Sequence, residues 1–175
     1  MLHIRLTLLA VITFGTSPAE ARAQSIADPA RLEGIERVQV RADATWDEMI
    51  TQSAGGATGA QFEEALRMTF SDAITSADAA PSVVAGAAVT VACHVDTFYE
   101  TGQVVYSLRT QLERPGDDGQ PVIVWIKSWV GNFSVQQLHV MFTLGDQCAE
   151  SFLDDWKRVN ESRDDVVEHS PGPIR

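Results

Sequence analysis

The chain is short of positive charge, has only two cysteines, and contains no apolar run long enough to cross a membrane. Its 175 residues include 13 Lys and Arg against 24 Asp and Glu, which gives a net charge of −11 and a pI of about 4.6. This balance excludes binding to nucleic acid or anionic lipid through bulk electrostatics. We therefore expect no nucleic-acid partner and no membrane span.

The sequence also lacks the motifs of several catalytic classes. It has no His-Glu-x-x-His, no Gly-x-Ser-x-Gly elbow and no Gly-x-Gly-x-x-Gly. The glycine-rich stretch 53–59 precedes a predicted helix, but it lacks the lysine of a phosphate-binding loop. The sequence therefore offers no assembled catalytic set, and it favours a protein without enzymatic activity, cofactor or metal.

Residues 1–23 are predicted to be a secretory signal peptide. A short positive start precedes the apolar stretch 6–14, and Ala21-Arg22-Ala23 has small residues at the two positions that a signal peptidase reads. The apolar stretch falls well short of the ~20 residues that span a bilayer. No cysteine lies near the cleavage site to carry a lipid anchor. We expect cleavage before Gln24 and a soluble product, periplasmic or secreted, from a bacterium.

Cys93 and Cys148 both remain in the predicted mature chain. Removal of residues 1–23 leaves 11 basic and 23 acidic residues, a net charge of −12. An oxidising compartment favours a disulfide between two such cysteines. Neither has the Cys-x-x-Cys spacing that is common around a catalytic thiol. The sequence therefore predicts a structural Cys93–Cys148 disulfide.

The pattern of apolar residues predicts one α+β domain over residues 24–159. Alternation predicts strands, and three- and four-residue spacing predicts helices. Thr58 with Gln61 and Ser134 with Gln137 have the spacing of capping boxes at helix starts. The polar, acidic tail 160–175 is predicted to be disordered. The expected elements, in chain order, are a strand at 34–42, a helix at 59–77, strands at 89–98, 104–113 and 121–131, and a helix at 135–159.

This order of elements predicts a two-layer α+β sandwich. Its sheet would have four strands, mainly antiparallel, in the order β-α-β-β-β-α, and the two helices would cover one face. The length supports this, because a domain of roughly 150 residues buries about 70% of the surface of its unfolded chain. Such a core needs no metal or dense disulfide framework.

The last predicted strand suggests a binding face. Trp125, Lys127 and Trp129 alternate there with valines and isoleucines. If the aliphatic residues face the helices, the tryptophans lie on the open side of the sheet. Exposed aromatic residues beside arginine are typical of protein contact sites. We therefore expect a module that binds a protein or a cell-envelope component through Trp125, Lys127, Trp129, Arg37, Arg41 and Arg109.

Three alternatives to this interpretation stay open. The tryptophans could pack as ordinary sheet residues. His94, Asp96 and a carboxylate such as Glu100 could serve a small metal-dependent hydrolytic enzyme, although a metal site needs three or four converging ligands. The protein could also carry a small ligand in an apolar cavity between helices and sheet, unless Phe62, Phe70, Phe142 and Phe152 pack densely there.

Overall fold

The computed structural model describes residues 24–25, 28–53 and 58–168. The predicted signal peptide and the end of the predicted tail, residues 169–175, lie outside this part of the chain. No helix within the described ranges is long and apolar enough to cross a membrane.

The sheet has six strands in the order β1-β6-β5-β4-β2-β3. Strands β4, β5 and β6 form an antiparallel meander, whereas β2 runs parallel to both β4 and β3. The α+β class is confirmed, but the expected four-stranded sheet is wrong in detail, because two-residue strands at the edges leave no periodic pattern in the sequence. The strands are β1 (Gln24–Ser25), β2 (Arg37–Thr45), β3 (Ser82–Val83), β4 (Thr90–Glu100), β5 (Gln103–Pro115) and β6 (Pro121–Ser134).

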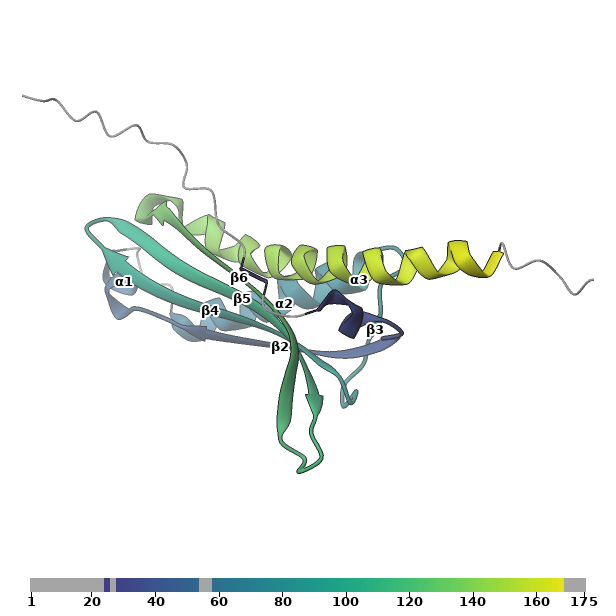
Figure 1. Ribbon diagram of the computed structural model, residues 1–175. Helices are drawn as coiled ribbons and strands as arrows, with labels where there is room; N and C mark the ends of the chain where they lie inside the picture. Colours follow the sequence, from purple (N-terminus) through teal and green to yellow (C-terminus); the bar gives the residue numbers. More distant parts are fainter. Residues whose placement is uncertain (1–23, 26–27, 54–57, 169–175) are drawn as a thin grey trace, which may run out of the picture.

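Helices α2 (Gly59–Ser76) and α3 (Leu144–Glu168) lie on the same side of the sheet and contact each other (Figure 1). The predicted capping box of Thr58 and Gln61 forms at the start of α2. The predicted helix 135–159 is instead a 3-10 helix, η2 (Val135–Thr143), followed by α3. The smaller helices are η1 (Pro29–Leu32) and α1 (Glu48–Ser53).

Helix α3 continues to Glu168, past Asn160, so the predicted start of the tail is too early. The side chain of Asn160 explains this. Its Oδ1 accepts a hydrogen bond from the Gly34 amide at 2.9 Å, and its Nδ2 donates to the carbonyls of Leu32 and Trp156 at 3.3 and 2.8 Å. These bonds hold the helix against the segment that precedes β2.

The two hairpin turns differ in shape. Thr101 and Gly102 form a tight connection between β4 and β5, and both have positive φ, which matches the twist of the flanking strands. The β5–β6 hairpin projects beyond the rest of the sheet (Figure 1). Its exposed Val122 and Ile123 lie on this projecting part.

The predicted disulfide joins Cys93 on β4 to Cys148 on α3, with Cα atoms 5.9 Å apart. Both cysteines are fully buried in the core between helices and sheet. The bond closes a loop with a sequence separation of 55 residues. In the chain-entropy description such a loop stabilises the fold by about 4 kcal/mol.

Gly145 lets α2 and α3 approach each other closely. A Cβ atom at this position would lie 2.7 Å from the amide nitrogen of Phe70 and 2.8 Å from the carbonyl oxygen of Leu66. Both are backbone atoms of α2, so they cannot move aside as a flexible side chain could. The close packing of α3 against α2 therefore requires glycine at the second residue of α3.

We expect Gly145→Ala to lower the free energy of unfolding by about 1–3 kcal/mol, the usual cost of overpacking a close contact. The gain in helix propensity, about 1 kcal/mol, does not offset the clash. Urea unfolding followed by circular dichroism measures the change. Glu161→Ala, at an exposed position of the same helix, is the control and should change stability by less than about 0.5 kcal/mol. Equal stability of Gly145→Ala and the unmodified protein would contradict the close contact.

Candidate functional site

Trp125 does not lie on the open face of the sheet. It pairs with Leu112, and both side chains are fully buried on the helical side. The Trp125 indole packs edge-on against Phe152 at a centroid distance of 6.2 Å, and its Nε1 donates a hydrogen bond to Asp155 at 3.2 Å. The prediction that Trp125 contacts a partner is therefore wrong, because the residue belongs to the core.

Lys127 and Trp129 follow Trp125 toward the helices. Lys127 Nζ lies 3.0 Å from Asp155 Oδ2, and Trp129 lines a hollow beside α3. Each alternation of β6 is mostly apolar and holds one polar residue in its middle, Lys127 or Ser128, so the valine pattern did not decide the face. A buried indole removes more apolar surface from water than a valine, which favours the observed orientation.

The three predicted arginines occupy the open face, separated from the tryptophans by the sheet itself. Arg37 and Arg109 are exposed, whereas Arg41 bonds through both terminal nitrogens to Glu113 at 3.0 and 2.7 Å. Arg41 also donates to Asp43 at 3.0 Å. The hydrogen bond to Glu113 is the largest of the effects that raise the pKa of Arg41. The expected basic and aromatic surface is thus divided between two faces, and part of its positive charge is neutralised.

His94 lies on the open face, but its imidazole is largely covered. The side chain is 16% exposed, Nδ1 lies 3.2 Å from Asp43 Oδ2, and the buried Nε2 has no hydrogen-bond partner in the described part of the chain. Burial is the main cause that lowers the pKa of His94, followed by the positive charge of Arg109. A covered nitrogen cannot take a proton from a substrate in this conformation.

The geometry also gives no support to the metal-dependent alternative. Within residues 24–25, 28–53 and 58–168, no group of three or more His, Cys, Asp or Glu side chains could hold a metal ion. His94 and Asp96 do share the open face of β4, as predicted, but no third ligand from these ranges joins them there. Both cysteines are consumed by the disulfide.

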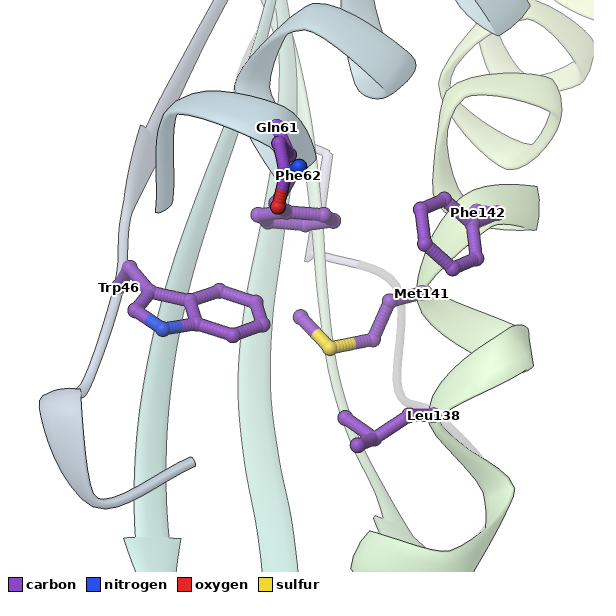
Figure 2. A pocket seen from close by; sticks show the side chains of 6 residues that line it. All are labelled: Trp46, Gln61, Phe62, Leu138, Met141 and Phe142. Carbon is purple, nitrogen blue, oxygen red and sulfur yellow. The ribbon is translucent and has the colours of Figure 1, made fainter. Parts of the chain in front are cut away.

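An apolar cavity of about 340 Å³ lies where α2 and η2 meet the end of β2. Figure 2 shows the Met141 side chain reaching toward Trp46, below the ring of Phe62. Met141 and Phe62 are almost fully buried, whereas Phe142 at the rim is 45% exposed. The cavity is lined by Trp46, Gln61, Phe62, Leu138, Met141 and Phe142.

The polar groups at this cavity are turned to other partners. The Trp46 Nε1 donates to Thr51 Oγ1 at 2.7 Å, and Gln61 Oε1 accepts from the Thr58 amide at 3.0 Å. Trp46 and Phe62 pack with ring centroids 5.2 Å apart, at a tilt of 43°. The space is therefore bounded by ring faces, methyl groups and a thioether, which suit an apolar occupant.

Of the residues that line this cavity, the sequence connected only Phe62 and Phe142 with a possible apolar cavity, and it gave Trp46, Leu138 and Met141 no role in a site. Dense packing of the four phenylalanines, the condition that would count against such a cavity, holds for Phe62, Phe70 and Phe152, which are buried, but not for Phe142. The hint in the sequence was the run from Leu138 to Phe142, where apolar residues exceed what one helical stripe can bury. The 3-10 form of η2 turns Phe142 outward.

No family model and no curated protein sequence matches this chain. Its fold is similar to that of two solved structures from Paraburkholderia phytofirmans, the PelC dodecamer and a point variant of PelC that is also a dodecamer. The variant structure is 12% identical, with a TM-score of 0.47, over 75% of this chain and 96% of that one. The PelC structure is 15% identical, with a TM-score of 0.46, over 76% and 96%. At these values the likeness carries no argument for ligand, activity or assembly.

Loss of the Asp155 carboxylate should destabilise the core strongly. Asp155 is 3% exposed and accepts from Trp125 and Lys127, and it also pairs with Arg158. We expect Asp155→Ala to lower the free energy of unfolding by about 3 kcal/mol, because it leaves a half-buried ammonium and an indole N–H without their acceptor. Urea unfolding measures the loss, and Asp154→Ala, at the exposed neighbouring position, should cost less than about 0.5 kcal/mol. Similar losses in both variants would contradict the assigned role.

Burial of neutral His94 should make the fold less stable in mild acid. The unfolded chain takes up a proton at this residue near pH 6.5, whereas the lowered pKa delays uptake in the folded chain. Stability conferred by neutral His94 is therefore present above about pH 6.5 and is lost as the pH falls toward the folded pKa, by at most about 1.4 kcal/mol per pH unit. His94→Gln should flatten the slope of unfolding free energy between about pH 6.5 and 5.

The matched control is His139→Gln, which makes the same replacement at an exposed histidine on η2. Urea unfolding at half-unit steps of pH measures both variants. The slope is the readout, so any uniform loss of stability in His94→Gln does not affect the comparison. An unaltered slope in His94→Gln would contradict the assignment.

Proposed function

We propose that this protein is an exported, non-catalytic binding module that receives an apolar group of an envelope component in the cavity of Trp46, Phe62 and Met141. The observation that carries this proposal is the cavity itself. Its volume of about 340 Å³ falls within the range of known ligand sites, and its lining is apolar with few polar groups.

The state of the reactive side chains supports a role without catalysis. Both cysteines are tied in a disulfide, and the Nε2 of His94 is covered. Arg41 and Glu113 neutralise each other on the open face. Bonded cysteines and a covered imidazole, beside an apolar hollow that is open at Phe142, suit binding rather than acid–base chemistry.

Export is supported by the predicted signal peptide and agrees with the disulfide. Buried structural disulfides persist in oxidising compartments and are rare in the cytosol. The same bond ties down the start of α3, directly after η2, which supplies one wall of the cavity. Oxidation would therefore help to keep the cavity preformed.

The test is binding of N-phenyl-1-naphthylamine, an apolar dye whose fluorescence rises in apolar surroundings. We expect saturable binding to the unmodified protein and a fall in affinity of at least fivefold in Leu138→Trp, which fills the cavity without making it polar. Met68→Trp adds the same side chain at an exposed position of α2 outside the cavity and should bind as the unmodified protein does. Thermal unfolding of both variants checks that they fold.

The methyl signal of Met141 in a proton–carbon NMR spectrum locates the dye. It should shift during the titration, because this side chain lines the cavity. Absence of saturable binding would overturn the proposal. So would binding that leaves the Met141 signal in place and is equally strong in Leu138→Trp.

A further inference from the structure

A second hollow, of about 330 Å³, lies between the β5–β6 side of the sheet and α3. It shares no lining residue with the apolar cavity. Two of the residues that the sequence singled out, Lys127 and Trp129, line it, although from the face opposite to the expected one. The other lining residues are Tyr106, Gln147, Glu150, Ser151 and Asp154.

The sheet contributes two aromatic rings to this hollow. Trp129 is half-buried, and Tyr106 lies over Gly131, where a Cβ atom would come within 2.5 Å of the tyrosine hydroxyl. Glycine at 131 therefore makes room for the Tyr106 ring. Burial raises the pKa of Tyr106, so its hydroxyl stays protonated and can donate a hydrogen bond.

Helix α3 contributes four polar side chains, and the buried hydroxyl of one of them has no partner within the described ranges. Ser151 is 6% exposed, and its buried Oγ makes no hydrogen bond within the described ranges. Such a group normally pairs with protein, water or ligand, because a buried hydroxyl without a bond is costly. Gln147, Glu150 and Asp154 recur at three- and four-residue spacing, which places them on one face of the helix with Ser151.

The charge of the hollow is negative. The ammonium of Lys127 is already paired with Asp155, at 3.0 Å. Asp155 also pairs with Arg158. Together with Glu150 and Asp154 these groups carry three negative and two positive charges, on a chain whose net charge is −11. An anionic ligand would be repelled, whereas a neutral or cationic one would not.

From these contacts we infer that the hollow of Trp129, Tyr106 and α3 binds a carbohydrate that is uncharged or carries amino groups. An indole offers an apolar face to the C–H groups of a sugar ring, and carboxylates and an amide accept and donate hydrogen bonds to its hydroxyls. An ammonium substituent would gain charge-assisted bonds to Glu150 and Asp154 and attraction to the indole face. The site is separate from the apolar cavity, so neither proposal depends on the other.

The test uses three oligosaccharides of equal length and different charge: chitohexaose, its fully deacetylated form, and hexagalacturonate. Titration calorimetry with the unmodified protein should detect the first two, with the deacetylated form at least as tight and weakened by added salt. Hexagalacturonate should not bind. In a proton–nitrogen spectrum the indole Nε1–H signal of Trp129 should shift.

Variants on the exposed side of α3 separate recognition from folding. Glu150→Gln with Asp154→Asn should lower affinity for the deacetylated oligosaccharide at least tenfold. Asp146→Asn removes one exposed carboxylate from the same helix outside the hollow and should change affinity by less than twofold. Trp129→Leu should weaken both sugars, and its thermal unfolding shows whether it folds.

The inference is overturned if neither chitohexaose nor its deacetylated form binds at millimolar concentration, or if hexagalacturonate binds as well as they do. It is also overturned if tetralysine binds the hollow and the sugars do not, since the ligand would then be a basic peptide. Equal losses in Asp146→Asn and in the double variant would likewise contradict it. The cavity variant Leu138→Trp should bind all three oligosaccharides as the unmodified protein does.

Discussion

The placement of α3 against the sheet is the constraint on which both hollows depend. The Cys93–Cys148 bond fixes the first turns of the helix to the central strand β4, and Gly145 brings the same turns into contact with α2. The residues just before this point, in η2, form one wall of the apolar cavity. Those just after it form one wall of the polar hollow. A shift of α3 would therefore alter both hollows together.

Further along α3 a buried polar contact supplements the covalent one. Asp155 bonds to Trp125 and Lys127 of β6. The outer strand of the meander is therefore joined to α3 by this contact, as β4 is joined to α3 by the disulfide. Sites held in this way are formed before a ligand arrives. Binding to a preformed site avoids much of the entropy cost of ordering side chains and loops, and this raises the affinity that a small hollow can reach.

The sequence predicted the features that are local along the chain. The capping boxes and the strand spans near 90–113 follow from spacing alone, and they are confirmed, as is the disulfide expected from export and the cysteine count. The parallel pairing of β2 with β4 is non-local and leaves no such pattern. The predicted orientation of β6 was wrong for a different reason, because its two alternations are about equally apolar and each holds one polar residue in its middle, Lys127 or Ser128.

The end of β6 held the information that would have decided its orientation. The tryptophan alternation continues to Phe133, which is buried, whereas the valine alternation continues through Ser128 to the exposed Asn132. The Leu112/Glu113 irregularity between β5 and β6 then breaks the alternation near the hairpin, so residues before Trp125 are a poor guide to those after it. The orientation of β6 is therefore better predicted from the alternation in which polar residues such as Ser128 and Asn132 recur, because that alternation faces solvent.

This orientation also explains why the two hollows lie at the boundary between helices and sheet. Burying Trp125 leaves the open face to charged residues, and there Arg41 pairs with both Asp43 and Glu113. Where the sheet meets α3, the rings of Trp129 and Tyr106 instead line an open hollow, and the Ser151 hydroxyl has no partner within the described ranges. On the open face His94 Nε2 and Gln111 Oε1 also lack partners within the described ranges, but it is the Ser151 hydroxyl that lies in a hollow, beside the rings of Trp129 and Tyr106.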